Sequence, residues 1–149
     1  MPDVTRLVVD TNIVVAAALS DRAGRESPNL ELLLWILEDA TDSPQMLTSN
    51  EILAEYERTL RRVKFRLSPE YVDVLLLGIE LVAIPTRPRR RVSLIRDPSD
   101  NPFMDCALEN EADYLITNNM DDYPREHGII SADEFLDLEF EEDEDGEEK

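Results

Sequence analysis

The sequence predicts one α/β domain in which a central parallel sheet is covered by helices on both faces. Short apolar segments alternate with helix-like segments along most of the 149-residue chain. The apolar segments also lack the polar–apolar alternation of a strand that has one face in water. Strands that are apolar throughout and separated by helices are typical of parallel sheets. A chain of this length with 42% hydrophobic residues suits a single core.

Five short segments are the expected strands: residues 6–10, 45–49, 81–85, 113–117 and 128–130. Six further segments are the expected helices: residues 12–20, 28–40, 49–62, 68–80, 101–112 and 131–138. Ser49 and Ser68 stand where helix N-caps are expected, and Pro69 suits a first helical position. Helix 28–40 is so densely apolar that we expect a deeply buried face and a homodimer contact.

The formal net charge of −19 is unevenly distributed. Residues 137–149 contain nine acids and one lysine. We expect residues 1–138 to form the domain and 139–149 to be a disordered acidic tail that serves solubility or acts as a decoy for a basic surface. An acidic chain fits nucleic-acid binding weakly, yet thirteen of the fifteen basic residues are Arg, and eight of these thirteen lie in the clusters 58–66 and 87–91. Arginine forks match phosphate geometry.

Cysteine and histidine are too rare to carry the chemistry. Cys106 is the one cysteine, which excludes an internal disulfide and favours a reducing compartment. It lies among apolar residues and is expected in the core, whereas Asp105 points about 155° from the apolar centre of its helix and is expected in solvent. His127 precedes a glycine in a loop. The N-terminal apolar run is too short to span a bilayer, so we expect a soluble cytoplasmic protein.

Carboxylate and amide side chains stand near the expected strand ends. Asp10 ends the first strand, and Asn119 lies just past the fourth. Asp97 and Asp100 precede helix 101–112. In doubly wound sheets, ligands bind beyond the carboxyl ends of the strands, where the strand order switches. These four residues are therefore expected at one edge of the sheet.

Glu55 is a further candidate. It lies about 110° from the centre of the apolar stripe of helix 49–62, so it flanks the core. Arg58 and Arg62 share its side of the helix. The same helix thus offers a carboxylate to a metal ion and guanidinium groups to a phosphate chain.

This set of side chains suits a divalent cation. Mg²⁺ and Mn²⁺ prefer hard oxygen ligands. A cation lowers the pKa of a bound water, which then attacks phosphorus. Ordinary structural roles remain open at this point. Asp97 before Pro98 starts a turn, Asp100 caps a helix, Glu55 pairs with Arg58, and Asn119 closes a turn.

Four segments carry a family resemblance: LVVDTNIVVAAAL, SNEILAEYERTLRR, DPSDNPFMDCALENEADYLITNN and GIISADEFLDL. In this order and spacing they resemble PIN-domain proteins, most of all the toxin components of toxin–antitoxin pairs related to VapC-type ribonucleases. The resemblance covers residues 5–138. It implies a three-layer α/β/α, Rossmann-like fold and a ribonuclease that depends on Mg²⁺ or Mn²⁺. It also implies an RNA substrate and a small antitoxin partner.

The resemblance assigns the site residue by residue. The first acid falls on Asp10, the second on Glu55, and the third on Asp100 with Asp97 nearby. The fourth, which is often Asp, falls on Asn119. An amide offers one neutral oxygen in place of a carboxylate, so this departure bears on metal affinity and on activity.

Further residues complete the predicted site. Asp121 lies two residues after Asn119, where a second carboxylate could compensate. The supporting residues are Thr11, Asn12 and Thr117, the last of which could orient a water. The predicted RNA-binding residues are Arg58, Arg62, Arg89 and Arg90.

Two other functions remain open. The first is a binding module that holds RNA or a protein without cutting it. The second is a phosphatase or phospho-acceptor with Asp10 as nucleophile, because other doubly wound folds also place an Asp after the first strand. That pattern expects a second Asp two residues later, where this chain has Asn12.

Overall fold

The computed structural model describes residues 4–87, 101–119 and 128–148. Within these residues the sheet has the order β3-β2-β1-β4-β5, and all its pairings are parallel. Its strands are β1 (Arg6–Val9), β2 (Gln45–Thr48), β3 (Ile84–Pro85), β4 (Tyr114–Ile116) and β5 (Ile129–Ile130).

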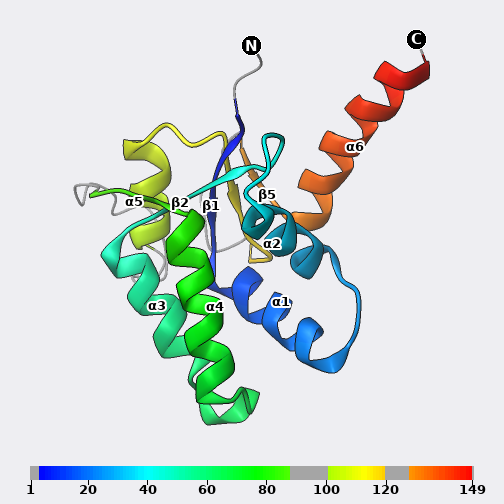
Figure 1. Ribbon diagram of the computed structural model, residues 1–149. Helices are drawn as coiled ribbons and strands as arrows, with labels where there is room; N and C mark the ends of the chain where they lie inside the picture. The colour runs from blue at the N-terminus through cyan, green and yellow to red at the C-terminus, as the bar shows by residue number, and fades with distance from the viewer. Residues whose placement is uncertain (1–3, 88–100, 120–127, 149) are drawn as a thin grey trace.

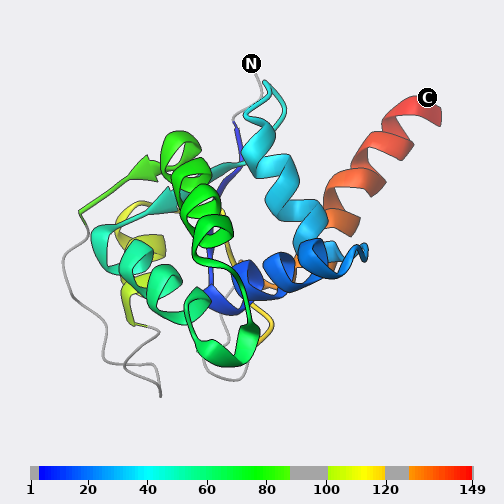
Figure 2. The same cartoon turned by 60° about the horizontal axis from the view of Figure 1, so that its bottom comes forward.

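Helices flank the sheet on both sides, as Figures 1 and 2 show. The α-helices are α1 (Thr11–Ala23), α2 (Pro28–Glu38), α3 (Asn50–Leu60), α4 (Pro69–Val82), α5 (Asn101–Glu109) and α6 (Ala132–Glu148), and a short 3₁₀ helix, η1, spans Val63–Phe65. In Figure 1, α3, α4 and α5 lie on one side of β1, and α1, α2 and α6 lie on the other. The predicted three-layer α/β/α fold with a central parallel sheet is confirmed.

The topology places a switch point beside β1. The chain builds β2 and β3 on one side of β1, then crosses to build β4 and β5 on the other. β1 pairs with β4 through Val9 and Ile116, and the N–H of Asp10 continues this ladder to the carbonyl of Ile116 at 2.9 Å. The register with β2 covers only the first two residues of β1, Arg6 and Leu7. Asp10 therefore lies at the switch point, where ligands bind in doubly wound sheets.

The core fills the space between the sheet and its helices. Leu7 and Val8 of β1 are fully buried, as is Ile116 of β4. Ile52 and Tyr56 bring one face of α3 onto the sheet and are also fully buried. Burial on both faces explains why the strands read as continuous apolar runs instead of alternating ones.

The helix caps follow the sequence signals. The hydroxyls of Ser49 and Ser68 accept hydrogen bonds from the N–H groups of Ile52 and Tyr71, as an N-cap requires. The prediction of a strand over residues 81–85 is wrong at its start. Helix α4 continues to Val82, so β3 spans only Ile84–Pro85. A short apolar run at a helix end has no period that distinguishes helix from strand.

The C-terminal helix is longer than the sequence suggested. We expected a helix that ends at residue 138 and a disordered segment after it, whereas α6 continues to Glu148. Glutamate is a good helix former, and Phe140 stacks on Trp35 of α2 with ring centroids 6.0 Å apart. The rest of α6 projects away from the body (Figures 1 and 2).

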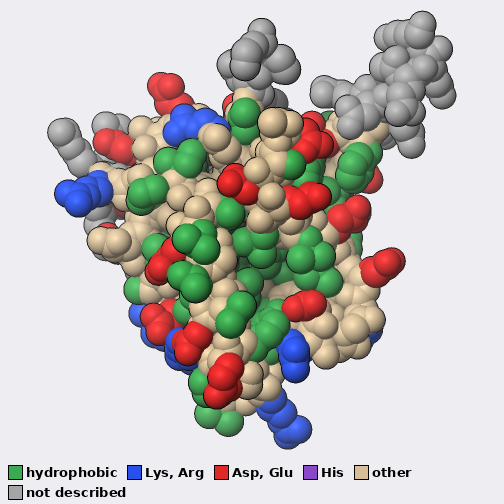
Figure 3. Space-filling view, in the orientation of Figure 1, with side chains coloured by type: hydrophobic (Ala, Val, Ile, Leu, Met, Phe, Trp, Pro, Cys, Tyr) green, Lys and Arg blue, Asp and Glu red, His purple; other side chains and the backbone are tan. Residues whose placement is uncertain are grey.

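Apolar side chains remain exposed on the face that Figure 3 presents. On α4, Val74, Leu77 and Leu81 are 71%, 56% and 76% exposed, and Leu34 of α2 is 54% exposed. Leu32, Leu33 and Ile36 are buried, as expected for the dense helix 28–40. In the described part of the chain, no helix is both long enough and apolar enough to cross a membrane.

Candidate active site

Asp10 is the centre of the candidate site. It directly follows β1, is only 2% exposed and occupies the N-cap position of α1. Its side chain makes no capping hydrogen bond to α1 within the described residues. Instead, Oδ2 of Asp10 accepts a hydrogen bond from the hydroxyl of Thr117 at 2.7 Å. The carboxylate is thus held at the end of the sheet by a neighbouring strand, and not by the helix that it precedes.

Thr117 is fixed from three sides. It follows β4 and is fully buried, and its N–H donates to the carbonyl of Ile130 at 2.9 Å. Its Oγ1 donates to Asp10 and accepts the N–H of Asn119 at 3.0 Å. Because the hydroxyl proton points to Asp10, the carboxylate receives a defined hydrogen bond on one oxygen. Thr117 therefore contacts Asp10 directly, whereas its predicted role of orienting a water stays a prediction.

Thr11 adds an unpaired hydroxyl beside Asp10. Its side chain is buried, with the residue 5% exposed, and Oγ1 has no hydrogen-bond partner among the described residues. Leaving a buried hydroxyl unpaired costs about 1–3 kcal/mol, so such an atom indicates a place for a ligand or a water. Asn12, the next residue, is exposed.

Glu55 lies on α3 with its side chain 15% exposed, which confirms that it flanks the core. It forms an ion pair with Arg58 one turn later, and Oε1 also accepts a long hydrogen bond of 3.5 Å from Thr59. The pairing with Arg58 that the spacing allowed is therefore present. Arg58 keeps a side chain that is 64% exposed, and Arg62 is exposed as well.

Tyr56, the residue after Glu55, reaches the end of β1. It is fully buried, and its hydroxyl donates to the carbonyl of Val9 at 2.5 Å. Burial raises the pKa of this hydroxyl well above its ordinary value, and the charge of Asp10 raises it further. The sequence pattern had placed Tyr56 only in the apolar stripe of its helix, which gives no signal for this contact.

Asp105 corrects a prediction. We expected this side chain in solvent, but the residue is only 4% exposed. It sits between Met104 and Cys106, which are buried too, because α5 contacts β1, β2, β4 and α3 at once. Asp105 is therefore a buried carboxylate that the sequence reasoning missed. Few acids are fully buried unless they are paired or bind metal, and the helical projection gave no signal of this burial.

Cys106 is confirmed as a core residue. It is fully buried, and its Sγ lies 3.4 Å from the hydroxyl of Thr86. Burial raises the pKa of the thiol, which outweighs the opposing hydrogen bonds from Thr86 and Asn110. A neutral, buried thiol is a poor nucleophile and a poor metal ligand.

Several predicted site residues lie outside the described residues: Asp97, Asp100, Asp121, Arg89 and Arg90. Asn119 is described and exposed, and its backbone N–H binds Thr117. The structure thus joins Asp10, Thr117 and Asn119 through hydrogen bonds, and it ties the α3 segment that contains Glu55 to β1 through Tyr56.

The donor chemistry fits a hard divalent cation. Asp10, Glu55 and Asp105 offer carboxylate oxygens, and Thr11 offers a buried hydroxyl. Oxygen donors are the ligands that Mg²⁺ and Mn²⁺ prefer. Among the described residues alone, no three His, Cys, Asp or Glu side chains gather closely enough to hold a metal ion.

The strand order is that of a doubly wound α/β protein. Asp10 and Thr117 form a polar site at the carboxyl edge of its sheet, where the strand order switches. A family model described as the PIN domain matches residues 6–121, a range that spans β1 to the segment after β4. The chain therefore belongs to the PIN-domain family. PIN domains are generally nucleases, and these nucleases typically use divalent metals. None of the curated proteins matches the chain.

Proposed function

We propose that this PIN domain is an endoribonuclease that hydrolyses RNA phosphodiester bonds with a water activated by Mg²⁺ or Mn²⁺. The observation that carries the proposal is the buried carboxylate of Asp10, which Thr117 holds at the switch point of the sheet. Carboxylate oxygens are the ligands that Mg²⁺ and Mn²⁺ prefer. A carboxylate held in a fixed place at this edge of the sheet is therefore suited to bind such a cation.

The residues take distinct roles in this proposal. Asp10 and Glu55 are ligands of the cation, directly or through water, together with Asp100 and with Asp97 or Asp121. Asp105 is a further buried carboxylate on α5, but Asp10, Glu55 and Asp105 do not form a three-ligand group by themselves. When bound, the cation lowers the pKa of a water and neutralises charge on the transferring phosphoryl group.

Other side chains orient the reactants. Thr117 fixes the carboxylate of Asp10, and the Asn119 amide supports a water near it. Arg58 and Arg62 stand on the exposed side of α3, where their guanidinium groups suit phosphate oxygens. Arg89 and Arg90 extend this basic path in the proposal. Asn119 contributes no charge, so we expect weaker metal affinity than a fourth carboxylate would give.

An RNA cleavage assay tests the proposal. Purified protein is incubated with structured and unstructured RNA in Mn²⁺, in Mg²⁺ and in EDTA, beside an Asp10→Asn variant. Cleavage that needs the metal and disappears in the variant supports the proposal. Cleavage that survives both EDTA and the substitution would come from a contaminant and would remove the support.

We propose further that the protein is the toxin of a toxin–antitoxin pair, with a small antitoxin that covers the site. The basis is the resemblance of the four segments to toxin components. Induced expression should arrest bacterial growth, and Asp10→Asn should relieve the arrest. A small reading frame beside the gene whose product restores growth would identify the partner. Growth that continues under wild-type induction counts against the toxin role.

A second candidate function is a PIN domain that binds RNA or a protein without cutting it. Asn119 at the fourth acidic position favours this reading, as does the absence of a three-ligand group among the described residues. Calorimetric titration with Mn²⁺ separates the two candidates. No binding at millimolar Mn²⁺ favours the binding module, whereas saturable binding that Asp10→Asn removes favours the nuclease.

We propose that the expected homodimer forms through exposed apolar side chains of α4 and α2. Val74, Leu77 and Leu81 form one exposed stripe on α4, and Leu34 is exposed on α2. Figure 3 shows apolar side chains gathered on this face. Light scattering should report twice the chain mass, and a Leu77→Glu, Leu81→Glu double variant should report the monomer. A wild-type monomer at high concentration would exclude the dimer.

A further inference from the structure

We propose that Tyr56 is a positioning residue that sets Asp10 at a fixed place relative to Glu55, through the hydrogen bond from its hydroxyl to the carbonyl of Val9. The inference rests on the proposed function, because it concerns carboxylates that hold a cation. The metal-binding test given below distinguishes failure of the inference from failure of the function.

The hydrogen bond between Tyr56 and Val9 lies at the end of β1, beyond the residues that pair with β2. Val9 and Asp10 share one peptide group, whose N–H binds the carbonyl of Ile116 on the β4 side. In a trans peptide the carbonyl points the opposite way, so the carbonyl of Val9 faces the β2 side. The register with β2 has already ended at Leu7. Tyr56 therefore supplies a partner to a buried carbonyl at the point where β1 and β2 separate.

The hydrogen bond connects the two carboxylate-bearing segments directly. Its donor belongs to the residue after Glu55, and its acceptor belongs to the residue before Asp10. Each carboxylate is thus one residue away from the contact. A change in the distance between the Tyr56 hydroxyl and the Val9 carbonyl would therefore move Glu55 relative to Asp10.

The ring of Tyr56 is well suited to act as a fixed point. It is fully buried, and it packs against the ring of Phe103 with centroids 6.1 Å apart. The buried ring thus holds the hydroxyl at the carbonyl of Val9.

A purely structural role would have different consequences. If the hydroxyl serves only to pair a buried carbonyl, its loss lowers stability and leaves metal affinity alone. If it positions Asp10, its loss also weakens the cation site. Groups that orient metal ligands without touching the metal typically contribute about 10- to 100-fold to metal affinity or activity.

Tyr56→Phe removes the hydroxyl and keeps the ring. The matched control is Tyr71→Phe, because the hydroxyl of Tyr71 also makes one hydrogen bond, to Asp21 at 2.7 Å between α4 and α1. Each protein is characterised by thermal unfolding, by calorimetric titration with Mn²⁺, and by kcat and KM for a cleaved RNA. Both variants should lose stability. We expect only Tyr56→Phe to weaken Mn²⁺ binding, by about tenfold, and to lower kcat with little change in KM.

The outcomes separate cleanly. Mn²⁺ affinity of Tyr56→Phe within twofold of the wild type would show that the hydroxyl only completes the core. An equal loss of affinity in Tyr71→Phe would trace the effect to general loosening and would also overturn the inference. A wild-type protein that binds no Mn²⁺ contradicts the proposed function itself, and the inference with it.

A second variant guards against a failure of Tyr56→Phe to fold. Phe103→Leu keeps the hydroxyl but removes the ring that packs beside Tyr56. We expect Phe103→Leu to lose less Mn²⁺ affinity than Tyr56→Phe. Its Tyr56 hydroxyl can still bind the carbonyl of Val9, but the ring is held less firmly. Unchanged Mn²⁺ affinity in a folded Phe103→Leu protein would count against a positioning role.

Discussion

The hydroxyl of Thr117 lies 2.7 Å from Oδ2 of Asp10 and joins the ends of β4 and β1 across the switch point of the sheet. The same hydroxyl accepts the N–H of Asn119, so three residues from two strand ends share one short hydrogen-bonded path. This path orients a carboxylate without neutralising it. It therefore provides what a cation site needs from its surroundings, an anionic oxygen ligand in a defined position.

Replacing Thr117 should weaken this site in a graded way. Thr117→Val keeps the shape and removes the hydroxyl, so both Asp10 and the N–H of Asn119 lose a partner. We expect a loss of about 1–3 kcal/mol in unfolding free energy and about tenfold in Mn²⁺ affinity, measured by urea unfolding and calorimetry. Thr117→Ser keeps the hydroxyl and should retain most of the affinity. Equal affinity in the Val and Ser variants would contradict this role.

Asp105 should matter for metal binding although it looked like a surface residue. Asp105→Asn keeps the size of the side chain and removes its charge. We expect Mn²⁺-dependent RNA cleavage to fall about 10- to 100-fold, measured under single-turnover conditions. Asp133→Asn, at an exposed position in the first turn of α6, is the control and should cleave like the wild type. Full activity in Asp105→Asn would assign its burial to packing alone.

Gly128 should be far less replaceable than Gly24. Both have positive φ, 98° and 69°, but a Cβ at Gly128 would lie 2.9 Å from the carbonyl oxygen of Asp113, whereas nothing lies within 4 Å at Gly24. Gly24→Ala should cost about 1–2 kcal/mol for the left-handed conformation. Gly128→Ala should cost more, because the carbonyl of Asp113 must move as well. Urea unfolding of the two variants checks the order, and equal losses would refute the steric argument.

Stability should fall as the solution becomes alkaline. Burial raises the pKa of the Tyr56 hydroxyl and of the Cys106 thiol above their ordinary values of 10.0 and 9.0. The folded state then holds protons that the unfolded chain releases, so unfolding becomes more favourable as pH rises. The stabilisation is complete below pH 9 and is lost progressively above it.

Unfolding in urea between pH 7 and pH 10.5 measures this effect. We expect a flat region at the lower end and a decline that starts near pH 9. The decline should be shallower in Tyr56→Phe, because that variant lacks a hydroxyl whose pKa is raised in the folded state. A decline of the same slope in both proteins would mean that other groups release the protons.

The fold and Asp10 were predictable because their signals are local. Apolar runs without alternation predict buried parallel strands, and Ser49 is a cap whose hydrogen bond depends only on its own helix. A carboxylate that directly follows a buried strand belongs at the carboxyl edge in any doubly wound sheet. These features need no knowledge of what packs against them.

Asp105 and Tyr56 were not predictable in the same way. A helical projection assumes one polar face, but Phe103, Met104, Asp105 and Cys106 are all buried because several elements surround α5. Tyr56 occupies a stripe position that a leucine could fill equally well. Its role depends on the separation of β1 from β2, which is a property of the assembled sheet. The roles assigned to the described residues remain predictions, as do those assigned to Asp97, Asp100, Asp121, Arg89 and Arg90.

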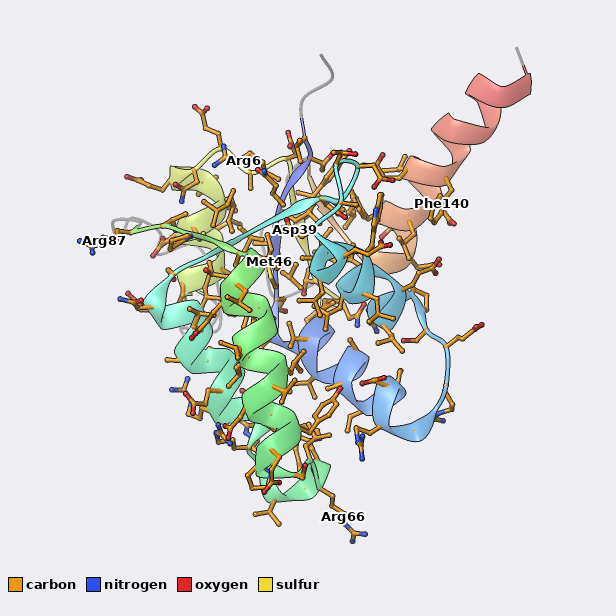
Figure 4. All side chains as sticks on the ribbon, viewed as in Figure 1. Arg6, Asp39, Met46, Arg66, Arg87 and Phe140 are labelled. Atoms are coloured by element: carbon orange, nitrogen blue, oxygen red, sulfur yellow. The ribbon has the colours of Figure 1, made fainter. Side chains whose placement is uncertain are left out.

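The direction of β1 and α6 has a practical consequence. In Figure 1 the chain enters β1 at the top, and α6 ends at the top as well, whereas Asp10 follows the lower end of β1. Figure 4 shows Arg66 pointing outward at the lower end of the molecule and Phe140 on α6 near the top. A tether fused to either terminus would therefore hold the protein by the end remote from Asp10. Immobilised in this way, the protein would present its carboxyl edge to RNA in solution.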